Sequence, residues 1–573
     1  MPRQAADSGH GRKGGVVFDT SSRPLLRSAE SSNLREIDMQ EALQNPNRIV
    51  EEVSRRRTFA IISHPDAGKT TLTEKLLLYG GAVNLAGVVR ARRSQTNAAS
   101  DFMEIEKQRG ISVTSTVLSF EYEGFLLNLL DTPGHQDFSE DTYRTLLAVD
   151  CAVMILDAAK GIETQTLKLF DVCRQRGLPI LTFINKMDRP TQDPLDLLGE
   201  IEKVLGMRAV PMNWPLGNGS RFKGVYEMKS GELHLFERTG HGASKARVRV
   251  AHPRSEDVAR LVEPDVFASF SEETELLEAA GEDFDREAFL AGKVTPVFFG
   301  SALTNFGVQL FLEEFLRLAP PPGPRHSDRG PVEATEADFS GFVFKIQADM
   351  NPRHRDRVAF LRVCTGRFER GMKVHCVRTG EVIRLTYPQR LFAQERETVD
   401  EAFPGDVVGL VNSGELVLGD TLVEGTDIHY DPIPLFPPEH FARVMVDDPS
   451  RRKQFNKALE QLQREGAIQI FWMADEHVRN PVMGAVGKLQ FEVVEHRLKS
   501  DYGVEARFEP LSYRLARWVV GPEELLEGFE PSRLARRALD CCDRPVALFP
   551  SEWDLNYTAE KNPGLEFLAV SPR

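Results

Sequence analysis

The chain lacks any uninterrupted apolar run of the roughly 18 residues that a membrane-spanning helix needs, which argues against an integral membrane protein. Cysteine is also scarce, with six among 573 residues and no CxxC pair at zinc-ligand spacing. So few cysteines exclude a disulfide framework and predict reduced thiols. The first residues, Met1 to Gly15, are polar and basic with no apolar stretch after them, unlike a secretory signal. We therefore expect a cytoplasmic protein with no membrane contact.

Positive charge is in deficit, because 71 Lys and Arg stand against 85 Asp and Glu and give a net charge of −14. This balance argues against a protein that wraps nucleic acid along its whole surface. Two short basic runs, 353–357 and 451–453, leave local patches open, although such runs are ordinarily solvated faces. The length is too great for one hydrophobic core and suggests about three to five domains.

The first half of the chain has an α/β rhythm. Residues 1–50 have little periodicity and predict a flexible N-terminal extension. Residues 51–320 alternate short apolar runs with polar helical stretches, which predicts a parallel sheet covered on both faces. Residues from about 207 to 293 break that rhythm and indicate an inserted subdomain. A proline-rich linker at 320–324 marks the end of this domain.

The second half changes pattern twice. Residues 335–432 combine alternating apolar positions with recurring glycine turns, which predicts a β-barrel domain. Residues 437–520 follow the order strand, helix, strand, strand, helix, strand, which is typical of a ferredoxin-like α/β unit. The pattern does not place residues 521–573, which we interpret as a C-terminal tail. The predicted fold class is thus α/β: a P-loop domain with a parallel sheet, a β-barrel and a ferredoxin-like domain.

The first chemical motif follows a predicted strand and opens a predicted helix. It matches the phosphate loop GxxxxGK[ST] except at its first position, where a serine stands for glycine. Its backbone N–H groups would hold phosphates at a helix N-terminus, with Lys69 on the β- and γ-phosphates and Thr70 on Mg²⁺. A chance match to a short pattern is the alternative. The motif comprises Ser63, His64, Pro65, Asp66, Ala67, Gly68, Lys69 and Thr70.

The second motif lies at the end of another predicted strand and comprises Asp131, Thr132, Pro133, Gly134 and His135. Asp131 is placed to hold Mg²⁺, through water. Gly134 can offer its N–H to a γ-phosphate with no side chain in the way. His135 would then lie near the attacking water, which makes it the candidate catalytic residue. Taken alone, His135 could equally be a surface histidine after a turn.

The third motif comprises Asn185, Lys186, Met187 and Asp188, again at a strand end. Guanine presents two adjacent donors, and the carboxylate of Asp188 can accept both, which adenine cannot offer. Asn185 would tie this loop to the phosphate loop, and the Lys186 stem could cover the base. A fourth segment, Ser301-Ala302-Leu303, would supply a backbone N–H to guanine O6.

The motifs occur in the required order, each directly after an apolar strand. That arrangement places them at the carboxyl ends of a parallel sheet, where ligands bind in such folds. Between the first two motifs runs a loop from about Val83 to Ser112. In a switch GTPase such a loop is held by the γ-phosphate and Mg²⁺, and Ser112 or Thr114 could supply the hydroxyl.

These segments together resemble a known family, the translational GTPases. The resemblance rests on SHPDAGKTT, QRGIS, DTPGHQDFSEDTYRTL, DAAKGIETQT, FINKMDR and VTPVFFGSAL. Within that family the chain looks like the GTPase-class bacterial peptide chain release factors, which DFSGFVFKIQADMNPRHRDRVAF and GAVGKLQFEVVEHRLKSDYGVEA also resemble. The likeness covers about Arg55 to Trp518. Ser63 and Ser112 depart from the wider family but fit the release-factor branch.

The resemblance implies a ribosome-stimulated GTPase with GTP/GDP and Mg²⁺ as cofactors. It implies Thr70, Ser112 and Asp131 as the metal site, His135 on the water, and Asn185 and Asp188 on guanine. The GTP form would bind the ribosome, both its RNA and the proteins of the factor-binding site, after a stop codon is read. It would promote dissociation and recycling of the stop-codon-reading release factors, its contact with them being indirect. We expect a monomer.

Three alternatives stay open at this point. A translocase-type elongation factor or ribosome-protection GTPase is disfavoured because only ~55 residues follow Trp518, short of the ~100 that a typical domain needs. A P-loop ATPase is disfavoured by Asn185 and Asp188. A ribosome-binding module without catalysis is disfavoured by Asp131 and His135.

Overall fold

The computed structural model describes residues 46–81, 115–133, 137, 139–237, 247–253, 255–281, 284–348, 357–392, 395–412, 415–425, 427–433, 436–474 and 480–570. The extension predicted for residues 1–50 lies outside these residues as far as position 45, and most of the basic run 353–357 lies outside them too. The described chain begins with helix α2 (Pro46–Ser54).

The apolar runs of the first half form one seven-stranded sheet in the order β2-β3-β1-β4-β5-β11-β6. Only β2 and β3 pair antiparallel, and every other neighbouring pair is parallel. Parallel strands covered on both faces need continuous apolar sequence, which these strands have. Their bounds are β1 Arg56–Ser63, β2 Thr116–Tyr122, β3 Phe125–Asp131, β4 Cys151–Asp157, β5 Ile180–Asn185, β6 Arg208–Pro211 and β11 Val294–Phe299.

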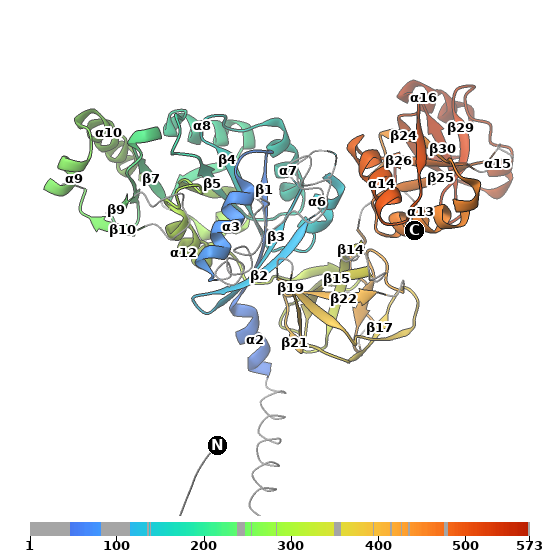
Figure 1. Ribbon diagram of the computed structural model, residues 1–573, viewed down its shortest axis with the longest axis horizontal. Helices are drawn as coiled ribbons and strands as arrows, with labels where there is room; N and C mark the ends of the chain where they lie inside the picture. The colour runs from blue at the N-terminus through green and yellow to red at the C-terminus, as the bar shows by residue number, and fades with distance from the viewer. Residues whose placement is uncertain are drawn as a thin grey trace, which may run out of the picture. The chain divides into compact units, whose positions relative to one another are not determined.

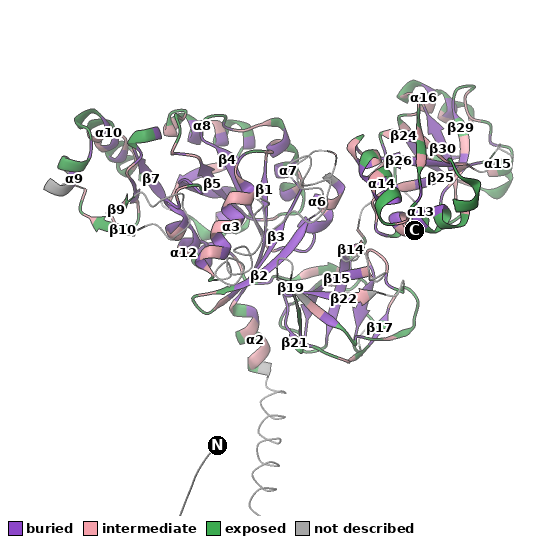
Figure 2. Cartoon of the chain, in the orientation of Figure 1, coloured by how far each residue is buried: buried purple, intermediate pink, exposed green. Residues whose placement is uncertain are grey.

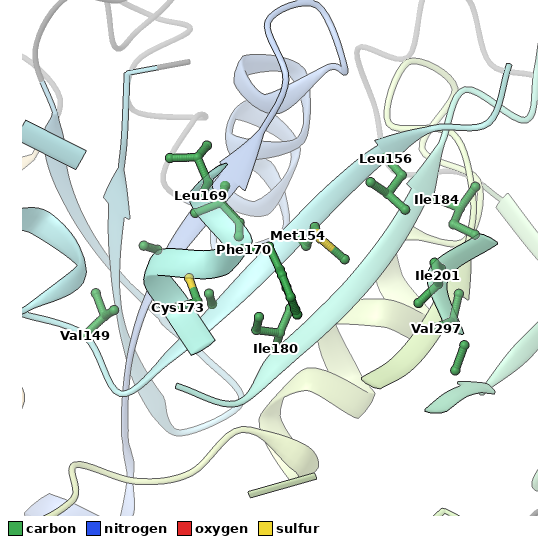
Figure 3. Close-up of a cluster of buried hydrophobic side chains, with 14 of the residues drawn as sticks. Val149, Met154, Leu156, Leu169, Phe170, Cys173, Ile180, Ile184, Ile201 and Val297 are labelled. Atoms are coloured by element: carbon green, nitrogen blue, oxygen red, sulfur yellow. The ribbon is translucent and has the colours of Figure 1, made fainter. Parts of the chain in front are cut away.

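Side chains alternate between the two faces of this sheet and build a separate core on each. Along β4, Met154 and Leu156 join one buried cluster, while Val153 and Ile155 join the other. Helices α7 (Thr164–Gln175) and α8 (Pro194–Leu205) cover the first face, as Figure 3 shows for Phe170 among its neighbours. Helices α3 (Lys69–Tyr79) and α12 (Val308–Leu318) cover the second. Helix α6 (Ser139–Leu146) follows β3.

The predicted insertion forms a second, smaller sheet of four antiparallel strands (Figure 1). Its strands are β7 Asn213–Leu216, β8 Gly224–Glu227, β9 Glu232–Glu237 and β10 Arg247–Ala251, and its helices are α9 Glu256–Leu261, α10 Pro264–Ala280 and α11 Arg286–Leu290. Strand β6, inside the range expected for the insertion, instead forms the edge of the main sheet, because Ala209 and Val210 are buried against it. Among the described residues, no helix is both long and apolar enough to span a membrane.

The predicted barrel follows the linker strands β12 (Arg325–Ser327) and β13 (Gly330–Val332). Eight strands pair antiparallel in the order β18-β17-β23-β14-β15-β22-β19-β20, and β16 pairs with β21. Their inward side chains form one cluster that includes Val343, Leu361 and Leu422. The bounds are β14 Ser340–Ala348, β15 Arg357–Thr365, β16 Phe368–Glu369, β17 Lys373–Cys376, β18 Val382–Arg384, β19 Pro388–Phe392, β20 Glu395–Thr398, β21 Glu401–Ala402, β22 Val407–Asn412 and β23 Thr421–Val423.

Buried ionic contacts join the barrel to the P-loop domain. Arg362 donates from one guanidinium nitrogen to both carboxylate oxygens of Asp150 at 2.8 Å, and from the other to the Ala148 carbonyl. Arg56 pairs with Asp406 at 2.9 Å. Burial disfavours the Arg362 charge, but Asp150 more than compensates and raises the pKa of Arg362 above its ordinary value. The two domains therefore form one unit with shared buried charges.

The third domain begins with the order that the sequence predicts. Strands β24 (His440–Val446), β25 (Gln469–Met473), β26 (Pro481–Ala485) and β27 (Ala506–Leu511) pair antiparallel in the spatial order β27-β24-β26-β25. Helices α13 (Arg452–Arg464) and α14 (Leu489–Ser500) connect them as in a ferredoxin-like unit. Together with the parallel sheet and the barrel, this unit confirms the predicted fold class.

The C-terminal end differs from the expected tail. Strand β29 pairs with β25, so the same sheet continues through β29, β30, β28 and β31. Trp518 and Val546 of this half share one buried cluster with Phe471 of the first half. Figure 2 marks the inner strands of both halves as buried. The added elements are β28 Leu515–Val520, α15 Glu523–Glu527, β29 Arg536–Leu539, β30 Pro545–Phe549, α16 Glu552–Lys561 and β31 Glu566–Leu568.

We predict that Arg362→Met weakens the joined unit. The methionine fills the space but leaves Asp150 as an uncompensated, poorly solvated charge, so we expect a loss of about 3–5 kcal/mol in unfolding free energy. Urea denaturation followed by circular dichroism measures it. Adding Asp150→Asn should restore part of the loss. As a control, Arg370→Met removes an exposed pair with Asp400 and should cost less than about 1 kcal/mol. Equal unfolding free energies of Arg362→Met and the wild type would contradict the prediction that the Arg362–Asp150 pair holds the two domains together.

Candidate nucleotide-binding site

The loop that carries the first motif connects β1 to α3 at the carboxyl edge of the main sheet. Ser63 is the last residue of β1, Lys69 is the first residue of α3, and Thr70 follows half-buried. The turn between them needs two residues in the left-handed region, Asp66 at φ 68° and Gly68 at φ 97°. A Cβ on Gly68 would lie 2.3 Å from Asn185 Nδ2. Gly68 is therefore fixed by backbone angle and by space.

The lysine of this loop reaches the second motif. Lys69 Nζ donates to Asp131 Oδ1 at 2.7 Å and also contacts the Thr132 carbonyl. Both Lys69 and Asp131 are buried. Thr132 Oγ1 donates to the Ile61 carbonyl at 2.8 Å, and Pro133 O accepts from Thr142 Oγ1 at 3.3 Å. The end of β3 is thus held beside the start of α3.

Asn185 links the first and third motifs and the Ser301 segment. Its Nδ2 donates to the Ala67 carbonyl at 2.8 Å, and its Oδ1 accepts from the Ala302 N–H at 2.9 Å. One buried amide therefore holds two loops that lie more than a hundred residues away on either side. The Ser301 segment, expected to supply a backbone N–H to guanine O6, is thus held by Asn185 through the Ala302 N–H.

Asp188 has a defined partner at the same edge. Its Oδ1 accepts a hydrogen bond from Ser301 Oγ at 2.6 Å, and the residue is half-buried. Met187 is fully buried, and its N–H donates to the Gly300 carbonyl at 3.1 Å. This packing turns the carboxylate of Asp188 toward the Ser301 segment while leaving capacity for further donors, since a carboxylate accepts several hydrogen bonds.

The sequence motifs do not include two further residues that lie at this edge. Asp157, at the end of β4, accepts from Lys186 Nζ at 2.7 Å. Burial would raise the pKa of Asp157, but the hydrogen bonds from Lys186 and from the Ala159 N–H lower it below its usual value. Glu163 lies 2.9 Å from His64 Nδ1. The sequence pattern could have predicted Asp157, because this carboxylate ends an apolar strand of the same parallel sheet.

The predicted residues Ser112, Gly134 and His135 lie outside the described residues, as do the whole loop from Val83 to Ser112 and the alternative hydroxyl, Thr114. The described members of all the other motifs lie at one edge of the sheet. A loop of backbone amides, a buried lysine, a carboxylate beside it and a second carboxylate on the base side are the parts that nucleoside triphosphate recognition requires.

Comparison with known proteins gives a model for each domain. Residues 54–321 match the elongation factor Tu GTP binding domain, residues 338–425 match elongation factor G domain 2, and residues 430–559 match the class II release factor RF3 C-terminal domain. A crystal structure of a protein from Thermus thermophilus is similar in fold, with a TM-score of 0.64 at 23% identity, over 85% of this chain and 72% of that one.

Whole-chain relatives agree with these matches. Peptide chain release factor 3 from Rippkaea orientalis is 55% identical over 91% of this chain and 97% of its own. The proteins of that name from Synechocystis sp. and Gloeobacter violaceus are 56% and 54% identical over 91% and 92% of this chain, and 96% and 100% of theirs. The chain is therefore a GTP-binding P-loop GTPase of the translational class. More narrowly, it belongs to the peptide chain release factor 3 family.

We predict that Gly68→Ala lowers GTP affinity by about a hundredfold or more. The added Cβ both collides with Asn185 and forces an alanine to a positive φ, which together cost a few kcal/mol. Titration with a fluorescent GTP analogue measures the affinity. Gly81→Ala is the matched control, because Gly81 has φ 74° but nothing within 4 Å of the added Cβ. It should keep its affinity and lose about 1 kcal/mol of stability. Equal GTP affinities of the two variants would show that the contact between residue 68 and Asn185 does not limit nucleotide binding.

We predict that Asp188→Asn moves nucleotide preference from GTP toward xanthosine triphosphate, because the amide can donate to a carbonyl at C2. The loss in GTP affinity should be on the order of a hundredfold or more, since two donors of the base lose a charged acceptor. Competition binding with the two triphosphates measures the ratio. Ser301→Ala keeps the carboxylate and should lose less than about tenfold. An unchanged ratio in Asp188→Asn would show that this carboxylate does not read the base.

Proposed function

We propose that this chain is a GTP-hydrolysing translation termination factor that binds the ribosome and promotes dissociation and recycling of the stop-codon-reading release factors. The observation that carries this is the match across all three domains, above all the release-factor model over residues 430–559. Relatives named peptide chain release factor 3 share 55% identity over 91% of the chain. We also propose that it acts as a monomer in the cytoplasm and contacts ribosomal RNA and proteins of the factor-binding site.

The alternative, a translocase-type elongation factor or ribosome-protection GTPase, is not favoured. The elongation factor models match the P-loop domain and the barrel, residues 54–321 and 338–425. The third domain matches a release factor model instead. The 23% identical crystal structure supports the fold alone.

The chemistry of the donor set fits Mg²⁺. Thr70 and Asp131 offer a hydroxyl and a carboxylate, the hard oxygen ligands that this ion prefers, and Ser112 would add a second hydroxyl. Among the described residues, Ser63 Oγ at the start of the loop is buried without a hydrogen-bond partner, as suits a loop that receives a polar ligand. When bound, Mg²⁺ would neutralise charge that develops on the β- and γ-phosphates.

The chain itself would orient the triphosphate and the base. Lys69, the first residue of α3, is placed to exchange its contact with Asp131 for phosphate oxygens. Asp188 and Asn185 hold the base-side loop, with the hydrogen bonds described above. Because phosphoryl transfer depends on positioning and charge stabilisation, these groups supply the ground-state alignment on which hydrolysis depends.

His135 would align the attacking water, and described residues before and after it in the sequence form hydrogen bonds to other parts of the chain. Before it, Thr132 and Pro133 bond to β1 and α6. After it, Asp137 Oδ2 accepts from the Leu489 N–H of the third domain at 2.7 Å. A shift of the third domain would therefore act on Asp137, two residues after His135 in the sequence. This supports hydrolysis that responds to ribosome contact.

A second tie runs from the barrel to the end of the loop that precedes β2. The buried Lys345 Nζ donates to Ser115 Oγ at 2.7 Å and lies 3.6 Å from Asp141 Oδ2 on α6. Asp141 also accepts from the Ser115 N–H at 2.8 Å. Although burial would raise the pKa of Asp141, Lys345 and this N–H lower it below its usual value. The barrel thus contacts residues that follow each of the two segments that a γ-phosphate would order.

We predict that His135→Ala keeps GTP affinity but loses ribosome-stimulated turnover by about a hundredfold or more, because general base and positioning groups contribute roughly 10²–10⁴. Single-turnover GTP hydrolysis with stop-codon-programmed ribosomes measures it. His375→Ala, at an exposed position of strand β17 in the barrel, is the matched control and should hydrolyse at the wild-type rate. Undiminished turnover in His135→Ala would reject this role.

The wider proposal is tested by release-factor recycling. Ribosomes that carry a stop codon and a limiting amount of the codon-reading factor are supplied with wild type or His135→Ala. Wild type plus GTP should raise the number of peptides released per codon-reading factor. No gain from the wild type, with normal ribosome-stimulated hydrolysis, would reject recycling and leave the GTPase activity in place.

A further inference from the structure

Two adjacent cysteines occupy the tip of a hairpin in the third domain. Cys541 and Cys542 lie between β29 and β30, and both are exposed. The Asp540 carbonyl accepts from the Asp543 N–H at 3.1 Å, so the two cysteines are the central residues of a β-turn. Asp543 takes a positive φ of 58°, which returns the chain to β30. Their Sγ atoms are 3.7 Å apart.

These thiols differ from the rest of the chain's cysteines. Cys151, Cys173, Cys364 and Cys376 are all buried. Burial raises the pKa of the Cys173 thiol to about 12 and also raises the pKa of Cys151 and Cys364. Because the thiolate is the reactive form and access is required, these four are inert at neutral pH. Exposed thiol chemistry is therefore confined to the hairpin tip.

A metal ion is a poor occupant of this tip, although Asp540 and both thiols could approach one ion. Both Asp540 oxygens already accept two donors each. Oδ1 takes the N–H groups of Cys542 and Arg544 at 2.8 and 3.0 Å, and Oδ2 takes Trp518 Nε1 and Arg544 Nε at 2.8 and 2.9 Å. Two thiols alone fall short of the four ligands that a structural zinc site uses.

We propose that Cys541 and Cys542 are a redox-active dithiol that a low-molecular-weight disulfide oxidises reversibly to a vicinal disulfide. The thiolate of Cys542 attacks one sulfur of the small disulfide, forms a mixed disulfide and expels one small thiolate. Cys541 then loses its proton and attacks Cys542 Sγ, expelling the second small thiolate. Two protons and two electrons pass from the protein to the small disulfide, which leaves as two thiols.

The order of attack follows from the local environment. Partial burial, and then the neighbouring Cys542 thiol, raise the pKa of Cys541 to about 12. Because the raised pKa keeps Cys541 protonated at neutral pH, we assign it the resolving role and give the first attack to Cys542. Adjacent Cα atoms are ~3.8 Å apart across a trans peptide, closer than the roughly 4.4–6.8 Å usual for disulfides. The bond is therefore strained, and strained exposed disulfides are the labile ones that thiols reduce again.

Trp518 should sense the formation of the Cys541–Cys542 disulfide. Asp540, next to Cys541, accepts from the indole of the buried Trp518 on β28. Rearranging the turn would alter the hydrogen bonds that hold Asp540, and with them the environment of Trp518. Oxidation at the surface would therefore change the surroundings of a core residue of the C-terminal half-sheet through the carboxylate of Asp540.

The test uses the full-length protein treated with excess oxidised glutathione. Wild type should lose two titratable thiols, gain no retained glutathione, and show a Cys541–Cys542 bond by peptide mass spectrometry. Dithiothreitol should restore both thiols. Cys541→Ser should retain one glutathione on Cys542, and Cys542→Ser should react slower by on the order of tenfold or more. Tryptophan emission should change on oxidation in wild type and in neither serine variant.

Several results would overturn the proposal. They are six unmodified thiols after treatment, stable glutathione on both cysteines of the wild type, or a disulfide between two chains. A fourth is stoichiometric binding of Zn²⁺ that protects both thiols and is lost in Asp540→Asn, which would assign a metal site instead. Circular dichroism of each variant confirms that the hairpin mutants fold, so a missing reaction cannot come from a misfolded chain.

Discussion

The donor and the acceptor of one side-chain amide, that of Asn185, hold the nucleotide-binding edge of this protein together. Asn185 donates to the phosphate loop through Nδ2 and accepts from the Ser301 segment through Oδ1. Both bonds are buried, so losing either would strand a polar group away from water. Gly68 must lack a side chain because this amide occupies the space. The phosphate-binding and base-binding sides of the site are therefore set relative to each other by one residue.

The same logic of shared polar groups extends beyond the P-loop domain. Arg362, Arg56 and Lys345 carry buried charge between the barrel and the P-loop domain, each with a carboxylate partner. Buried ion pairs give less net stability than their Coulomb attraction suggests, because both charges are desolvated. They do fix a single arrangement, since any other leaves a charge unpaired. The barrel is in this way tied to segments on both sides of the second motif.

The sequence predicted those features that depend on local pattern. Ser63 to Thr70, Asp131 to Pro133 and Asn185 to Asp188 all follow apolar strands, and parallel strands bring their carboxyl ends to one edge. It did not reveal Lys345 beside Ser115, or Asp157 beside Lys186, because such pairs are distant along the chain and no periodicity marks them. It also left residues 521–573 unplaced. Pairing of β29 with β25 joins segments more than sixty residues apart, and short antiparallel strands carry a weak signal.

That pairing has a bearing on how the third domain can be dissected. The ferredoxin-like half, taken by itself, would end at β25 with an open row of N–H and C=O groups, and Phe471 would lose the neighbouring Trp518. Unprotected sheet edges of this kind recruit strands from other chains. The last sixty or so residues therefore act as a built-in cover for that edge, which ties solubility of the domain to the segment whose sequence is hardest to interpret.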